Sequence, residues 1–136
     1  MARVLFVCTH NAGRSQMSEA LFNRAACEAH EGLSAGSEPV DRVHPGVIAV
    51  MDEVGIDLRS KTPRPLTREL AEWADVVVTM GCGDACPYIP GKRYLDWELE
   101  DPKDRPAEAV RAIRDDIARR IQELLAKLNA ASAERW

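Results

Sequence analysis

The feature that most constrains the fold of this chain is a strand, a loop and a helix that follow one another at its start. Val4 to Cys8 is an unbroken apolar run, which is typical of a strand buried on both faces of a parallel sheet. We expect this strand to span Arg3–Val7 and a helix to begin at Arg14. Because parallel strands must be joined by crossovers, usually helical ones, this beginning predicts an α/β fold.

The rest of the chain continues the alternation of helices and strands. Helices are expected at 14–31, 45–54, 66–73 and 106–128, strands at 33–37, 75–79 and 92–97, and a glycine- and proline-rich loop at 81–91. The last helix has an apolar stripe with three- and four-residue spacing. Its members are Val110, Ile113, Ile117, Ile121, Leu124 and Leu128. The tail after Asn129 is expected to fray.

Composition excludes several classes of protein. Apolar residues make up 46% of the chain, enough for one core, and no apolar run approaches the roughly 20 residues of a membrane-spanning helix. The formal net charge of −4 disfavours a general nucleic-acid binder. No secretory signal is recognisable, so we expect a cytoplasmic protein whose four cysteines serve catalysis, metal binding or burial rather than structural disulfides.

The segment between the first strand and helix has the makeup of an oxyanion site. It reads Cys8-Thr9-His10-Asn11-Ala12-Gly13-Arg14-Ser15, with five residues between the cysteine and the arginine. That spacing lets the backbone wrap around one tetrahedral oxyanion with its N–H groups pointing inward. The helix N-terminus adds unpaired N–H groups, and the Arg14 guanidinium closes the open side of the pocket. We call this pocket, formed by residues 8–15, the cup. Such a positive pocket favours the thiolate of Cys8, which is the candidate nucleophile, and Ser15 can donate a hydrogen bond to it.

This loop resembles the signature loop of the low-molecular-weight protein-tyrosine-phosphatase family. Further segments of the chain match that family: Ser34-Ala35-Gly36, Gly55-Ile56-Asp57, the valine strand and Asp101-Pro102. The resemblance covers about residues 3–128, the expected ordered core of a single domain spanning 1–136. It implies a phosphotyrosine phosphatase I-like fold, which is a three-layer α/β/α arrangement with a four-stranded parallel sheet in the flavodoxin-like order 2-1-3-4. It also implies that Asp101 is the general acid.

Two more cysteines follow the valine strand, in Gly81-Cys82-Gly83-Asp84-Ala85-Cys86-Pro87. Because the carboxyl ends of parallel strands share one edge of the sheet, this loop is expected near Cys8. The segment resembles the arsenate reductase branch of the same family, which has a cysteine pair after this strand. The resemblance implies a relay in which Cys8 attacks arsenate, Cys82 then attacks Cys8, and Cys86 attacks Cys82.

The relay implies exchanging partners and no tightly bound cofactor. Arsenate is the expected substrate, with phosphate or sulfate as mimics. Thioredoxin is the expected thiol donor, although glutaredoxin with glutathione and mycothiol with mycoredoxin remain open. Some reductases of this branch hold a potassium ion beside the loop, and Asn11, Glu19 and Ser34 match part of that site, whereas Pro63 and Arg64 occupy the place of an expected acidic ligand. The expected protein is a monomeric cytoplasmic enzyme of arsenic detoxification.

Three other functions remain open from the sequence. Zinc can be held by Cys8, His10, Cys82 and Cys86, although a metal would neutralise the thiolate. A phosphatase acting on phosphotyrosine or a small phosphomonoester needs only the first cysteine, although Lys103-Asp104 stands where typical phosphatases of the family have tyrosines. A non-enzymatic redox sensor or oxyanion-binding module would use Cys82 and Cys86 as its switch.

The remaining cysteine and histidines are assigned structural places. Cys27 is expected to be buried on the apolar face of the first helix. His30 is expected at the surface, and His44 at the start of a helix before Pro45. Without the family pattern, Asp101 also fits a solvated turn residue before proline.

Overall fold

The computed structural model describes residues 1–81 and 90–134. In these residues four strands form one parallel sheet, in the order β2-β1-β3-β4. The strands are β1 (Arg3–Cys8), β2 (Glu31–Gly36), β3 (Val76–Thr79) and β4 (Arg93–Asp96). The predicted α/β fold and its flavodoxin-like strand order are therefore confirmed.

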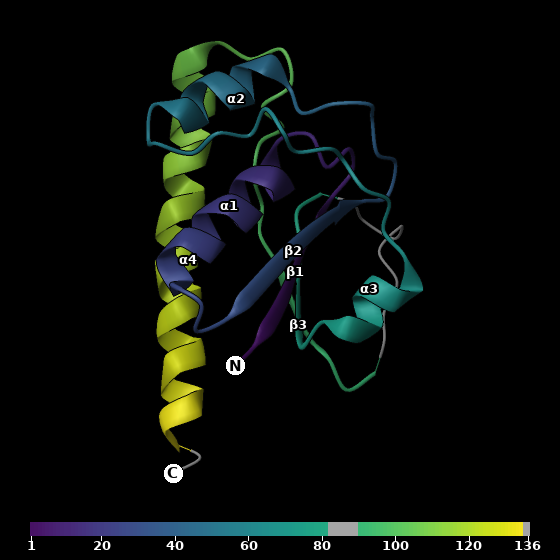
Figure 1. The fold of residues 1–136 in the computed structure, drawn as a ribbon, viewed down its shortest axis with the longest axis vertical. Coiled ribbons are helices and arrows are strands. Elements are labelled where there is room, and N and C mark those ends of the chain that lie inside the picture. The colour runs from purple at the N-terminus through teal and green to yellow at the C-terminus, as the bar shows by residue number, and fades with distance from the viewer. Residues whose placement is uncertain (82–89, 135–136) are drawn as a thin grey trace.

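Helices cover the two faces of the sheet unequally. They are α1 (Arg14–Ala26), α2 (Pro45–Asp52), α3 (Arg68–Trp73) and α4 (Ala107–Glu134). As Figure 1 shows, α1, α2 and α4 lie on one side of the sheet and the short α3 on the other. None of the helices in the described residues is long and apolar enough to cross a membrane.

Two hydrophobic cores lie on the two faces of the sheet, and strand β1 contributes to both. Val4 and Phe6 pack with the residues of α1 and α4, whereas Leu5 and Val7 pack on the side of α3. All four side chains are fully buried, because successive residues of a strand point to opposite faces and both faces of β1 are covered. The Phe6 ring meets Phe22 of α1 edge-on, with 5.5 Å between the ring centroids. The apolar run at the start of the chain is thus explained by a central parallel strand.

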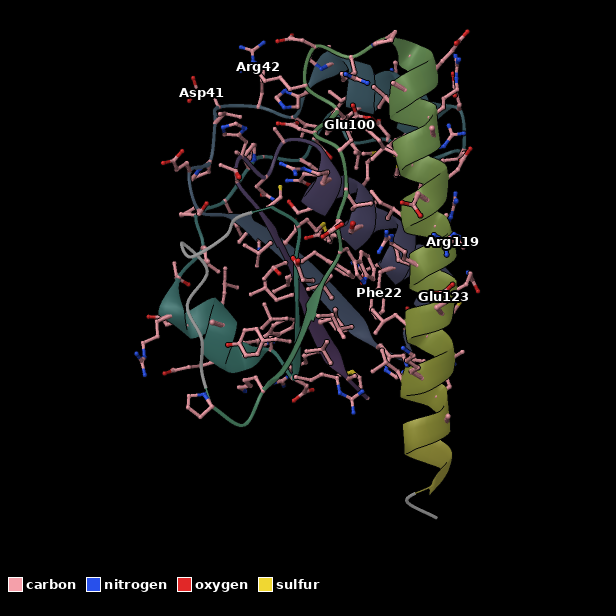
Figure 2. All side chains as sticks on the ribbon, turned by 180° about the vertical axis from the view of Figure 1, so that it is seen from behind. Phe22, Asp41, Arg42, Glu100, Arg119 and Glu123 are labelled. Atoms are coloured by element: carbon pink, nitrogen blue, oxygen red, sulfur yellow. The ribbon has the colours of Figure 1, made fainter. Side chains whose placement is uncertain are left out.

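Helix α4 is longer than the sequence predicted. Its six predicted stripe residues are buried, but the helix does not fray after Asn129 and continues to Glu134. Alanines at positions 130, 131 and 133 favour the added turn, and the Asn129 side chain is fixed by a 2.9 Å hydrogen bond to the His30 ring. Arg119 and Glu123, labelled in Figure 2, form an ion pair on the exposed side of this helix.

Helix α1 is shorter than predicted, and this corrects two assignments. It ends at Ala26, and Cys27 and Glu28 adopt left-handed backbone angles with φ of 47° and 70°. The reason is that the chain from Glu31 onward pairs with β1, so the helix must stop early. Cys27 is therefore exposed and not buried. His30 is 6% exposed and not a surface residue, and its Nδ1 accepts a 2.9 Å hydrogen bond from the Ala2 N–H.

An ion-pair cluster joins α2 to α4. Glu53, just after α2, accepts hydrogen bonds of 2.8–3.0 Å from Arg111 and one of 2.9 Å from Arg114. The hydrogen bond from Arg111 is the main cause that lowers the pKa of Glu53 from 4.5 to about 2, against a smaller opposing effect of desolvation. Because the folded carboxylate holds its proton less tightly than the unfolded one, the stabilisation is complete above pH 4.5 and is lost as the pH falls toward 2.

We therefore expect Glu53→Gln to lower the melting temperature by a few degrees at pH 7 and by progressively less as the pH falls below 4.5. Thermal unfolding followed by circular dichroism over this pH range checks the prediction. Glu123→Gln is the matched control, because its partner Arg119 lies on the same helix and joins no two elements. An equal destabilisation by Glu53→Gln at pH 7 and near pH 2 would contradict the assignment.

Candidate active site

Cys8 is the last residue of β1 and lies at the carboxyl edge of the sheet, where ligands bind in folds of this type. It is 2% exposed, and its Sγ lies 2.9 Å from the Oγ of Ser15 in the first turn of α1. Ser15 is itself fully buried. The sulfur is therefore enclosed by the loop that connects β1 to α1, with a hydroxyl group as its neighbour.

Asn11 organises the interior of this loop. It is fully buried and has a left-handed backbone with φ of 53°, a conformation that asparagine tolerates better than most residues. Its Nδ2 donates to Ser15 Oγ at 2.7 Å and to Ser34 Oγ at 3.0 Å. Because Ser15 Oγ accepts this bond, its own hydrogen is free to point at the Cys8 sulfur. Ser15 is thus arranged as a donor that stabilises a thiolate.

The backbone of the loop turns its carbonyl groups outward. The carbonyl oxygens of Cys8, Thr9, His10 and Ala12 accept hydrogen bonds from the N–H groups of Ser37, Glu38, Val40 and His44. In the described part of the chain the N–H groups of residues 9–13 have no acceptor, and α1 begins without a side-chain cap. These N–H groups are therefore available to an oxyanion, and the helix N-terminus adds its positive end.

Arg14 is held beside the loop by neighbours from two other segments. Its side chain is 9% exposed, Nη1 donates to the Leu99 carbonyl at 3.4 Å, and Nη2 lies 3.9 Å from Asp101 Oδ2. Gly81, two residues after the end of β3, packs against it so closely that a Cβ there would lie 2.7 Å from Arg14 Nη1. Gly81 also has φ of 88°, and its carbonyl accepts a 3.2 Å hydrogen bond from Thr9. Gly81, the residue before Cys82, therefore lies against the loop between β1 and α1.

The Asp101-Pro102 segment packs on the same loop. A Cβ at residue 13 would lie 2.6 Å from Pro102 Cγ, so Gly13 is required for this approach. Asp101 is 44% exposed and accepts a 3.0 Å hydrogen bond from the Lys103 N–H. His44 also lies near Gly13, and burial lowers the pKa of His44 below 6.5 although the Asp101 charge opposes this. A carboxyl group reachable by solvent thus stands beside the guanidinium.

The structure brings together all the predicted site residues that it describes. Cys8 contacts Ser15, and Arg14, the neighbour of Ser15 in the chain, lies beside Asp101. The oxyanion-binding candidates make up the loop after Cys8 and the start of α1: Thr9, His10, Asn11, Ala12, Gly13, Arg14 and Ser15. Cys82 and Cys86 lie outside the described residues, so the relay and the zinc alternative that shares them stay predictions. Three contributors were missed by sequence reasoning: Gly81, the Leu99 carbonyl and Lys61.

The residues expected to hold potassium do not fit a free cation. Asn11 Oδ1, the oxygen that would ligate it, accepts hydrogen bonds from Gln16 Nε2 at 3.1 Å and from the Arg64 N–H at 2.9 Å. Ser34 Oγ donates to Glu19 Oε1 at 3.1 Å, and Glu19 Oε2 lies 3.5 Å from Lys61 Nζ. Within residues 1–81 and 90–134, no three His, Cys, Asp or Glu side chains gather as metal ligands. The oxygens that would serve potassium are therefore engaged by the protein.

Comparison with known proteins places this geometry among relatives. The model of the low molecular weight phosphotyrosine protein phosphatase family matches residues 3–134. A putative arsenate reductase of Halobacterium salinarum is 41% identical over 129 residues, which cover 91% of each chain. The glutaredoxin arsenate reductase of a Synechocystis species is 37% identical over 132 residues, covering 95% of this chain and 100% of that protein.

A solved structure of an arsenate reductase is also similar to this chain. The thioredoxin-dependent arsenate reductase of Corynebacterium glutamicum superposes with a TM-score of 0.82 at 41% identity. The match covers 96% of this chain and 63% of that one. The family match, the oxyanion loop and the Asp-Pro segment lead to one conclusion: the chain belongs to the low-molecular-weight phosphotyrosine protein phosphatase family.

Proposed function

We propose that this chain reduces arsenate to arsenite in arsenic detoxification, with Cys8 as the nucleophile and Cys82 and Cys86 as resolving cysteines. The observation that carries the proposal is the contact of Gly81 with both Arg14 and Thr9, because it holds the residue before Cys82 at the loop that encloses Cys8. Relatives named arsenate reductases, which match nearly the whole chain, support the same reaction.

The loop first binds arsenate, which has the shape and charge of phosphate. The N–H groups of residues 9–13, which have no acceptor among the described residues, and the Arg14 guanidinium meet the oxyanion oxygens. The Cys8 thiolate, favoured by the Ser15 hydroxyl at 2.9 Å, attacks arsenic. Asp101 donates a proton to the departing oxygen, which leaves as water. The product of this step is an arsenic(V) group bound to the Cys8 sulfur.

Electrons pass to arsenic in the second step. The Cys82 thiolate attacks Cys8 Sγ, the sulfur–arsenic bond breaks, and its electron pair stays on arsenic, which leaves as arsenite. The two sulfurs are oxidised to a Cys8–Cys82 disulfide. The Cys86 thiolate then attacks Cys82 Sγ, so that Cys8 leaves as a thiolate and a Cys82–Cys86 disulfide remains. Each exchange requires an attacking thiolate within reach of the disulfide.

An external dithiol reduces the final disulfide, and we propose thioredoxin for this role, supported by the thioredoxin-dependent relative of 41% identity. The glutaredoxin-named relative keeps glutaredoxin as the second candidate. We further propose a monomer in the cytoplasm, where thiol systems keep the cysteines reduced. In the described residues the exposed large apolar side chains are Met1 and Val40, which offer little surface for a stable partner.

Phosphomonoester hydrolysis is the second candidate function. This reaction requires Cys8, Arg14 and Asp101, of which Arg14 lies 3.9 Å from Asp101, and it does not require the cysteine pair. These three groups are sufficient for nucleophilic attack on phosphorus and protonation of a leaving oxygen. We propose this as a weak side activity, since the same cup accepts phosphate.

The functions are separated by turnover assays on the purified chain. Steady-state arsenite release, measured with arsenate and either a thioredoxin or a glutaredoxin system, supports the reductase. Hydrolysis of p-nitrophenyl phosphate without arsenite release supports the phosphatase instead. The absence of both activities would contradict both enzymes and favour the redox sensor.

A further inference from the structure

A buried carboxylate lies behind the oxyanion loop. Glu19, on α1, has a side chain that is 7% exposed, and its Oε2 faces the Lys61 ammonium at 3.5 Å. Lys61 comes from the segment between α2 and α3 and is 49% exposed. A buried charge is costly unless it is paired and hydrogen-bonded, so this ammonium is the counter-ion that lets Glu19 remain ionised inside the protein.

Hydrogen bonds connect Glu19 to the nucleophile. Glu19 Oε1 accepts from Ser34 Oγ at 3.1 Å, and Ser34 Oγ accepts from Asn11 Nδ2 at 3.0 Å. Asn11 Nδ2 also donates to Ser15 Oγ at 2.7 Å, and Ser15 Oγ lies 2.9 Å from Cys8 Sγ. We name this series from Glu19 to Cys8 the carboxylate chain.

An ionised Glu19 fixes the direction of the Ser34 hydroxyl in the carboxylate chain. A carboxylate can only accept, so Ser34 must donate to it and must accept from the Asn11 amide. This agrees with the orientation of the Asn11 amide, whose Oδ1 accepts from the Arg64 N–H at 2.9 Å and whose NH₂ group faces Ser15, leaving the Ser15 hydrogen for Cys8. If Glu19 were protonated or displaced, the Ser34 hydroxyl could turn its hydrogen toward the Asn11 NH₂ group and weaken the support of that side chain.

We propose that Lys61 is a positioning residue of the active site: its ammonium is a built-in cation for Glu19, in the place where a free potassium ion would otherwise be expected. It keeps the carboxylate chain directed toward a Cys8 thiolate and makes the site independent of added potassium. The inference rests on the proposed role of Cys8 as the nucleophile. The engaged oxygens of Asn11, Ser34 and Glu19 support it, because groups of the protein already occupy the oxygens that match the potassium site.

The test compares Lys61→Met with Lys61→Arg and with the control Lys127→Met, an exposed lysine of α4. The readout is the rate of Cys8 alkylation by iodoacetamide, followed by peptide mapping, together with kcat for arsenate. We expect Lys61→Met to slow Cys8 alkylation and lower kcat by about 3- to 10-fold, the effect of losing one hydrogen bond's worth of thiolate stabilisation. Lys61→Arg should restore both, and Lys127→Met should change neither.

Potassium provides the second arm. With potassium chloride or tetramethylammonium chloride at equal ionic strength, wild-type alkylation, kcat and melting temperature should be equal. A wild-type response to potassium in any of the three, or wild-type alkylation in Lys61→Met, would overturn the proposal. If alkylation follows the predicted pattern while no variant reduces arsenate, the positioning role stands and the proposed reaction fails.

A charge-neutral background keeps the test valid if Lys61→Met does not fold. Glu19→Gln retains an acceptor for Ser34 but removes the charge that Lys61 neutralises. In that background we expect Lys61→Met to leave the Cys8 alkylation rate unchanged, because the counter-ion has nothing to neutralise. If Lys61→Met slowed Cys8 alkylation equally with and without Glu19→Gln, Lys61 would act independently of Glu19, and this result would overturn the proposal.

Discussion

Replacing Cys8 with serine is expected to lower kcat for arsenate reduction by about 10⁴-fold or more, because the hydroxyl is a far weaker nucleophile than the thiolate and cannot enter a disulfide. Binding should survive, since the free N–H groups of residues 9–13 and the Arg14 guanidinium are unchanged. We expect the variant to bind phosphate within a few-fold of the wild-type Kd. Arsenite release measured with a thioredoxin system, and phosphate titration by calorimetry, check the two parts.

Two variants serve as controls for the Cys8 result. Ser15→Ala removes the hydroxyl 2.9 Å from the sulfur and should lower kcat by a smaller amount, about 10- to 100-fold. Cys27→Ser removes an exposed thiol outside the cup and should leave kcat unchanged. Steady-state reduction by Cys8→Ser at more than a few per cent of the wild-type rate would contradict the assignment of the nucleophile.

Replacing Cys82 with serine is expected to abolish steady-state arsenate reduction and permit at most one turnover. Without this thiolate the Cys8 sulfur has no partner that can take it from arsenic, so the electron pair cannot reach arsenic through the relay. Phosphate binding and any hydrolysis of p-nitrophenyl phosphate should persist, because Cys8, Arg14 and Asp101 are unchanged. Rapid-quench measurement of arsenite per enzyme molecule, without added small thiols, checks the stoichiometry.

Cys86→Ser is the informative companion of the Cys82 variant. It retains the first exchange and should release one arsenite per molecule, leaving a trapped Cys8–Cys82 disulfide. Continued turnover by Cys82→Ser with thioredoxin as the sole reductant would refute the relay. The phosphatase readout separates this outcome from a general loss of the active site.

The oxyanion loop was predictable from the sequence because its parts are contiguous. Cys8 ends one strand, and Arg14 and Ser15 begin the next helix, so spacing along the chain decides their arrangement in space. The core face of α4 was predictable for the same reason, since its stripe repeats within one helix. Asp101 was identified through the family resemblance, and it lies 3.9 Å from Arg14, while its role as the general acid stays a prediction.

Contacts between distant segments were not predictable from local patterns. The pairing of Lys61 with Glu19 joins the segment after α2 to α1, and the seat of Gly81 on Arg14 joins the end of β3 to the loop. The end of α1 was predicted wrongly for a related reason. The helical pattern continues past Ala26 in the sequence, but the helix stops there because Glu31 pairs with Arg3 in the sheet. Cys27 was therefore assigned to a helix face that does not exist.

The most direct test is peptide mapping by mass spectrometry after one exposure of the reduced wild-type chain to arsenate, with no reductant present. The predicted result is one arsenite released per molecule, a disulfide between residues 82 and 86, and free thiols at residues 8 and 27. Arsenite release with all four thiols still reduced, or a bridge that includes Cys27, would contradict the reaction described for the Cys8 loop.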